Sequence, residues 1–149
     1  MGEVHLGTAH LSDAALVEEF ESCRLPAAQF HHADHIRLAW IFLGQMDEAA
    51  ATRRIERAIR RYAEHNGIGQ KYHQTITLAW MMLVATARRA TPHAVCFNEF
   101  AELHPELLGV KNLNNYYTPE RLARPEARSG WLEPDLQPLP GVQGGRSMT

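Results

Sequence analysis

The residues in this chain whose type and spacing best support chemistry are histidines in two short segments. His31, His32 and His35 crowd into Phe-His-His-Ala-Asp-His, and His73 follows later in Lys-Tyr-His-Gln-Thr-Ile-Thr. Histidine is the commonest metal ligand and the usual acid or base near neutral pH. Three protein ligands beside an open position are typical of a catalytic metal. The two segments therefore suggest a buried polar site, most simply a metal site.

Helical spacing determines which of these histidines can act together. Residues three or four positions apart share one face of a helix, so His35 can act with either His32 or His31. His35 and His73 each head the apolar stripe of a separate helix. If those stripes face each other, the two histidines meet near one end of the core. We therefore predict that His32, His35 and His73 are the metal ligands, with His31 as the alternative to His32.

Two metal-free roles for the histidines stay open. They can form a polar pocket in which His73 and His35 are the acid and the base. They can also be structural residues, satisfied by hydrogen bonds, in a helical module that binds a ligand or another protein. A transition metal in the purified protein would favour the metal site over both of these roles.

Neighbouring polar residues are candidates for assisting the site. Asp34 either accepts a hydrogen bond from an imidazole or is a favourable charge at a helix N-terminus. Lys71 either binds an anionic substrate, or acts as an acid, or is solvated. Tyr117 supplies a phenol or forms the edge of the core. Thr75 and Thr77 line the pocket or bond back to their own helix. We predict Lys71, Asp34 and Tyr117 as the catalytic residues.

Composition bounds the class of protein. The chain has 149 residues, 45% of them hydrophobic and 21% charged, with a formal net charge of −2. These values are ordinary for one soluble globular domain. The near-neutral charge does not favour nucleic acid or an anionic membrane as a partner. Neither a signal peptide nor an apolar run of membrane-spanning length is present, so we expect a cytoplasmic protein.

The hydrophobic pattern predicts an all-α protein. We expect an up-and-down bundle of four core helices, a fifth helix and an extended Pro-rich C-terminal wrap. Residues 1–140 would form a single helical domain, followed by a disordered tail over 141–149. The expected helices run from Ser12 to the break at Leu25-Pro26, then over residues 31–45, 47–65, 72–89, 94–103 and 118–124.

The third of these helices is rich in arginine. Such a helix can bind nucleic acid, but Glu56 and Glu64 dilute its charge and no aromatic residues are interleaved for stacking. We therefore interpret the arginines as a solvated face and expect no nucleic-acid partner. They are Arg53, Arg54, Arg57, Arg60 and Arg61.

Several motifs together resemble a family of small bacterial helical proteins. They are the two histidine segments, Tyr-Tyr-Thr-Pro-Glu from Tyr116, and Glu-Pro-Asp-Leu-Gln-Pro-Leu-Pro from Glu133. The resemblance covers residues 10–140 and implies the pattern Phe-x-His-x-x-His, which selects His32 over His31. It implies no activity. The chain also resembles, more loosely, the DinB/YfiT-like bundles, four-helix proteins with a three-histidine metal site. Their histidines occur in the reverse order, so that likeness is one of architecture.

The sequence thus predicts a small metal-dependent enzyme of hydrolase, lyase or transferase type. Its cofactor would be a divalent transition metal, and Zn²⁺, Ni²⁺, Fe²⁺ and Mn²⁺ all suit imidazole ligands. Its partner would be a small-molecule substrate or ligand, with neither nucleic acid nor membrane involved. A homodimer through the fifth helix or the Pro-rich tail stays open. The alternative is the metal-free ligand-binding or interaction module.

Overall fold

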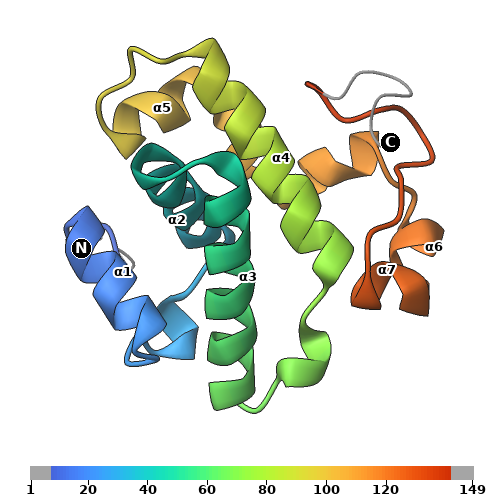
Figure 1. Ribbon diagram of the computed structural model, residues 1–149, viewed down its shortest axis with the longest axis horizontal. Coiled ribbons are helices and arrows are strands. Elements are labelled where there is room, and N and C mark those ends of the chain that lie inside the picture. The colour runs from blue at the N-terminus through green and yellow to red at the C-terminus, as the bar shows by residue number, and fades with distance from the viewer. Residues whose placement is uncertain (1–7, 142–149) are drawn as a thin grey trace. The chain divides into compact units, whose positions relative to one another are not determined.

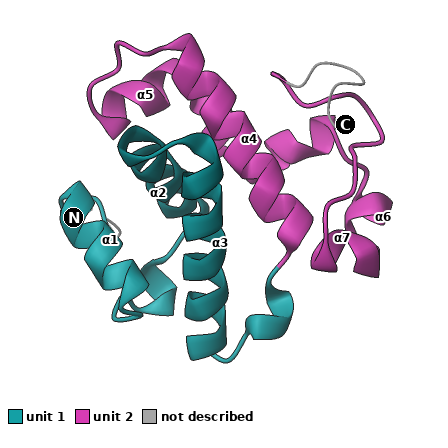
Figure 2. Ribbon diagram, viewed as in Figure 1, with its two compact units in different colours: residues 1–72 teal, residues 73–149 magenta. Residues whose placement is uncertain are grey.

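The computed structural model describes residues 8–141, and all regular secondary structure in that range is helical (Figure 1). The predicted all-α class is confirmed, although the up-and-down arrangement of four helices stays a prediction. The chain divides into two compact units, residues 1–72 and 73–149 (Figure 2). Apart from Gly141, the predicted disordered tail lies outside the described residues. No helix within the described range is long and apolar enough to cross a bilayer.

Three α-helices build the first unit: α1 (Asp13–Glu21), α2 (His32–Gln45) and α3 (Glu48–His65). N-cap side chains stabilise the first turns of α1 and α3. Ser12 accepts a hydrogen bond from the backbone of Ala15, and Asp47 does the same for Ala50. These caps satisfy backbone N–H groups that have no partner inside a helix. The start of α3 therefore falls where the sequence predicts it.

The first helix ends earlier than predicted. The sequence predicts that it reaches the Leu25-Pro26 break, but α1 stops at Glu21 because Cys23 adopts a left-handed conformation with φ of 65°. A residue in that conformation commonly closes a helix C-terminus, although glycine is the usual residue there. The chain then passes through a short 3-10 helix, η2 (Ala27–Gln29), before α2 begins.

An aromatic cluster fixes the segment that leads into the first histidines. Phe20, Phe30 and Tyr62 have ring centroids between 4.5 and 5.2 Å apart. The Tyr62 hydroxyl donates a 2.7 Å hydrogen bond to the Leu25 carbonyl. Aromatic contacts of this kind add to the stability gained by burial. The backbone before His31 is therefore anchored to α1 and α3.

The second unit is built around α4 (Gln74–Ala90). This helix starts later than predicted because His73 is its N-cap, and α5 (Phe97–Leu103) starts at Phe97 rather than Ala94. Two short helices follow, α6 (Pro119–Leu122) and α7 (Pro125–Ser129). α6 begins at the predicted Thr118 cap but ends before Arg124, and the sequence does not predict α7. The remaining 3-10 helices of the described range are η3 (Gly69–Lys71), η4 (Pro105–Leu108) and η5 (Val110–Asn115).

Residues 130–140, called here the C-terminal strap, are free of helix, as the Pro-rich composition predicts. Within the second unit the strap is held along α4. Thr75 donates a 2.5 Å hydrogen bond to the Gly130 carbonyl, and Thr86 donates a 3.0 Å hydrogen bond to the Pro140 carbonyl. The strap therefore depends on polar side chains of α4 along much of its length.

Candidate functional site

His35 lies near the start of α2 and has an unusual environment. Its Nε2 atom is buried and has no hydrogen-bond partner among residues 8–141. Burial, and after it the charge of His32, lower the pKa of His35 from 6.5 to about 4. Most buried polar atoms in native proteins are hydrogen-bonded, so an exception calls for a physical reason. A neutral imidazole with an unsatisfied nitrogen is a candidate for binding a ligand.

His32, rather than His31, lies beside His35. The rings of His32 and His35 meet edge to face, with centroids 6.2 Å apart and planes at 82°. His31 is the N-cap residue of α2 and is exposed. The two histidines on one helix face are therefore His32 and His35.

Asp34 stabilises the start of α2. It is 7% exposed. One carboxylate oxygen accepts a 2.8 Å hydrogen bond from the backbone N–H of His31, and the other accepts a hydrogen bond from the Thr8 hydroxyl. A carboxylate in the first turn also interacts favourably with the helix dipole. Among the described residues the Asp34 carboxylate makes no hydrogen bond to an imidazole, and its geometry matches the helix-terminus role. Its catalytic role stays a prediction.

His73 is the N-cap of α4, and both of its ring nitrogens are used. Nδ1 accepts a 3.1 Å hydrogen bond from the Ile76 backbone N–H, and Nε2 lies 2.7 Å from the Leu122 carbonyl oxygen. This pair of partners assigns the tautomer with hydrogen on Nε2. Burial lowers the pKa of His73, which keeps the ring neutral, and the Leu122 bond only partly opposes it. A metal at His73 would have to replace one of these hydrogen bonds.

The threonines that follow His73 are also structural in their contacts. The Thr75 hydroxyl donates to the Gly130 carbonyl and accepts a 3.1 Å hydrogen bond from the Leu132 backbone N–H. The Thr77 hydroxyl donates back to the His73 carbonyl at 2.9 Å. Both threonines are buried. The motif around His73 therefore joins α4 to the C-terminal strap and to α6.

Tyr117 is fully buried and contacts the same C-terminal strap. Its hydroxyl donates a 2.6 Å hydrogen bond to the Leu132 carbonyl, and its ring meets Trp131 edge to face. Burial raises the pKa of Tyr117 well above 10, which keeps the phenol protonated. These contacts match the interpretation of Tyr117 as part of the core, and its catalytic role stays a prediction.

Lys71, the third predicted catalytic residue, ends η3 in the first unit and is exposed. It comes two positions before His73 in the chain, but the boundary between the two units falls between them. Its position is compatible both with a solvated lysine and with an anion-binding one.

The predicted metal site draws on both units, because His32 and His35 belong to the first and His73 begins the second. Among residues 8–141, no group of three or more His, Cys, Asp or Glu side chains is arranged to hold a metal ion. The three-histidine metal site therefore stays a prediction. What the structure brings together is the pair of His32 and His35.

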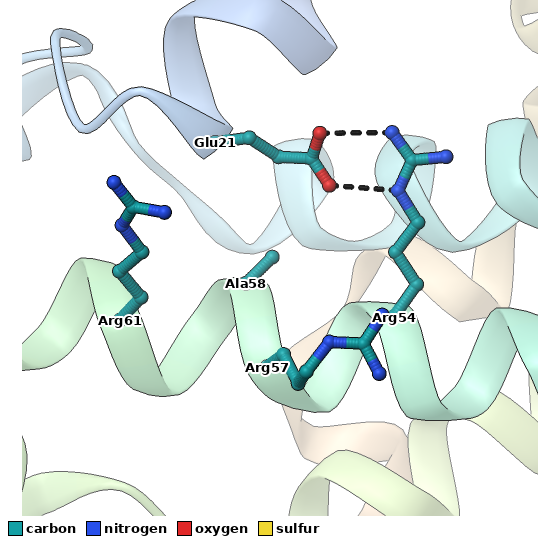
Figure 3. A pocket seen from close by; sticks show the side chains of 5 residues that line it. All are labelled: Glu21, Arg54, Arg57, Ala58 and Arg61. Atoms are coloured by element: carbon teal, nitrogen blue, oxygen red, sulfur yellow. Dashed lines mark hydrogen bonds and ion pairs between the residues drawn. The ribbon is translucent and has the colours of Figure 1, made fainter.

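The first unit also carries a pocket that the sequence does not predict (Figure 3). It has a volume of about 350 Å³ and lies where α3 faces the end of α1. Its signal in the sequence is a set of arginines spaced three and four residues apart, a pattern that by itself favours a solvated face. The lining residues are Glu21, Arg54, Arg57, Ala58 and Arg61.

Comparison of the chain with protein-family models, with curated proteins and with solved structures gives no match.

Proposed function

We propose that this protein is a small metal-dependent enzyme acting on a small molecule, with His35 and His32 as metal ligands. The observation that supports the proposal is the buried Nε2 of His35, which has no partner among residues 8–141. Leaving a buried polar atom unsatisfied costs about 1–3 kcal/mol. A bound metal ion would give this nitrogen the partner that the described part of the chain does not supply.

The residues of the first unit fit such a group chemically. Imidazole binds a metal in its neutral form, and the low pKa of His35 keeps it neutral at neutral pH. His32 is one helical turn away and presents a second imidazole. Imidazole ligands suit Zn²⁺, Ni²⁺, Fe²⁺ or Mn²⁺. His73 would be the third ligand after giving up one of its hydrogen bonds.

When bound, a divalent metal polarises a carbonyl or activates water, which suits a hydrolase, lyase or transferase. The chain's own contribution would be to hold the two imidazoles on one rigid helix face. Asp34 would secure that face by capping α2 and by tying Thr8 to it. Lys71 would attract an anionic substrate from its exposed position.

The test is the metal content of the protein purified without a polyhistidine tag, measured by elemental mass spectrometry before and after chelation. We expect about one equivalent of a transition metal, with loss in His35→Ala and His32→Ala. His93→Ala is the matched control, because His93 is exposed and distant in sequence. Retention of metal in both variants would reject His32 and His35 as ligands.

His73 needs a variant that keeps its capping role. Asparagine is among the best N-cap residues, so His73→Asn removes the imidazole while preserving the start of α4. Loss of metal in this folded variant would identify His73 as the third ligand. Full retention would place the third ligand elsewhere.

A second candidate is the metal-free helical module that binds a ligand or a protein. The hydrogen bonds of His73 and Tyr117 favour it, because they use the polar atoms of both side chains for structure. This candidate predicts no metal after reconstitution with each of the four ions. It also predicts that small-molecule ligands, found by thermal shift, bind equally well in the presence of a chelator.

A further inference from the structure

The pocket on the first unit is lined by three arginines and one glutamate, whereas the chain as a whole has a formal net charge of −2. Arg57 has an arginine at every helical neighbour position, three and four residues before and after it. Like charges at these spacings destabilise a helix unless an anion compensates them. The four neighbours are Arg53, Arg54, Arg60 and Arg61.

Two of the pocket's guanidinium groups have no partner within residues 8–141. In that range, neither Arg57 nor Arg61 makes a side-chain hydrogen bond or ion pair. Figure 3 shows Arg54 and Arg61 rising from α3 on either side of Ala58, with Arg57 extending along the helix toward the base of Arg54. The small side chain of Ala58 leaves the space between them open.

The one acidic residue that lines the pocket is already neutralised. Both carboxylate oxygens of Glu21 accept 2.8 Å hydrogen bonds from Arg54, through Nε and one terminal nitrogen. The Arg54 guanidinium also lies 4.5 Å from the centre of the Phe42 ring. A paired, stacked arginine of this kind is held in place. Glu21 and Arg54 therefore form a fixed wall, and the charge of Arg57 and Arg61 remains uncompensated.

We propose that this pocket binds the phosphate group of a small phosphorylated molecule. Three arginines and one glutamate give the lining a formal charge of +2, from +3 and −1. A phosphate monoester carries about −1.5 to −2 at neutral pH, which matches that charge. Guanidinium groups bind phosphate through paired N–H donors. The volume of about 350 Å³ lies within the range of about 300–1,000 Å³ of small-molecule sites.

In this site Arg57 and Arg61 bind the phosphate oxygens directly. Arg54 contributes charge to the wall but is held by Glu21. None of these residues is His32 or His35. A test of phosphate binding at this pocket is therefore independent of the test of the proposed metal centre. Phosphate binding also accounts for the clustering of arginines on one face of α3, which solvation alone does not explain.

The experiment is calorimetric titration of the full chain with inorganic phosphate and with glycerol 3-phosphate, in a buffer free of both. We expect saturable binding, weakened about tenfold or more by Arg57→Gln and by Arg61→Gln, since each removes a charged hydrogen-bond donor pair. Arg53→Gln is the matched control: it removes the same charge from the same helix but does not line the pocket. It should weaken binding less than twofold.

Several outcomes count against the proposal. No saturable binding in the wild-type protein overturns it, and so does equal weakening by all three variants, which would indicate only nonspecific attraction. Preference for malonate over both phosphates would assign the pocket to carboxylates instead. Tighter binding of single-stranded RNA than of glycerol 3-phosphate would assign the arginines to nucleic acid.

Tighter binding of glycerol 3-phosphate than of inorganic phosphate would instead support the proposal, with an organic phosphate as the ligand.

Discussion

His35 in the first unit and His73 in the second both keep a ring nitrogen away from water, but they differ in their partners. His73 has a backbone N–H for one nitrogen and a backbone carbonyl for the other. His35 has no partner for its buried Nε2 within residues 8–141. In sequence the two look alike, since each is followed by Leu-Ala-Trp in an apolar helical segment.

This difference separates a histidine whose two ring nitrogens are both hydrogen-bonded from one that has a buried nitrogen without a partner among residues 8–141. A satisfied buried polar group contributes to stability, whereas an unsatisfied one reduces it. Buried polar groups without a partner are rare in native proteins, so each one calls for a physical explanation. Measurements that treat the two histidines in parallel therefore test the assignment directly.

The largest expected effect is that of pH on stability. The pKa of His35 is about 4 in the folded chain and 6.5 when unfolded, so below pH 6.5 the unfolded state binds more protons. Stability is therefore complete above pH 6.5 and falls as the pH decreases, by about 3 kcal/mol at pH 4. The lowered pKa of His73 acts in the same direction. Urea denaturation of metal-free protein at several pH values measures this slope. A His35→Leu variant with the wild-type pH dependence would contradict it.

Next in size is the effect of removing His73. His73→Ala eliminates an N-cap and the hydrogen bond to Leu122, so we expect a loss of about 2–3 kcal/mol in the free energy of unfolding. His73→Asn keeps the cap and should recover about 1 kcal/mol of that loss. Chemical denaturation followed by circular dichroism measures both. Equal stability of His73→Ala and the wild type would mean that these bonds contribute nothing.

Thr75 tests whether the strap depends on α4. Thr75→Val keeps the shape but removes the hydroxyl that bonds Gly130 and Leu132, which should cost about 1–2 kcal/mol. Thr86→Val removes the more exposed bond to Pro140 and a 3.3 Å hydrogen bond that Thr86 accepts from Arg89, and it should cost about 0.5 kcal/mol. Hydrogen exchange of the Leu132 amide provides a second measurement. The order of the two variants would be reversed if the strap were held mainly by its C-terminal end.

The last expected effect is small and has the opposite sign. His35→Leu replaces an unsatisfied imidazole with an apolar side chain, so the metal-free protein should be unchanged or more stable by up to about 1 kcal/mol at neutral pH. Thermal unfolding in the presence of a chelator measures this. A loss as large as that of His73→Ala would show that His35 is a structural residue as well, and would remove the distinction between the two histidines.

Local signals in the sequence were sufficient where a helix is set by its own termini. Asp47 caps α3, and Asn66 with Gly67 ends it, so both bounds of this helix agree with the prediction. The early end of α1 could not be predicted, because it depends on a cysteine in a left-handed conformation. The sequence does not predict α7, because five residues are too few to show a helical period.

The roles of the site residues depend on contacts that the sequence does not display. His73 is paired with Leu122, which lies 49 positions further along the chain, and Tyr117 with Leu132. Residue type and spacing identified these side chains as important, but their partners are backbone groups, which every residue carries. The arginines of α3 were visible in the sequence, whereas their pocket required the end of α1 beside them.

The C-terminal strap has a consequence for the order in which the protein folds as it is synthesised. The hydroxyl of Thr75 bonds the carbonyl of Gly130, 55 positions later in the chain. The hydroxyl of Thr86 bonds that of Pro140, 54 positions later. Chains emerge from the ribosome N-terminus first, and contacts between distant residues form slowly. The helices of the first unit can associate early, whereas α4 remains incompletely bonded until the strap has emerged. During that interval the hydroxyl groups of Thr75 and Thr86 lack the strap partners that they have in the folded chain.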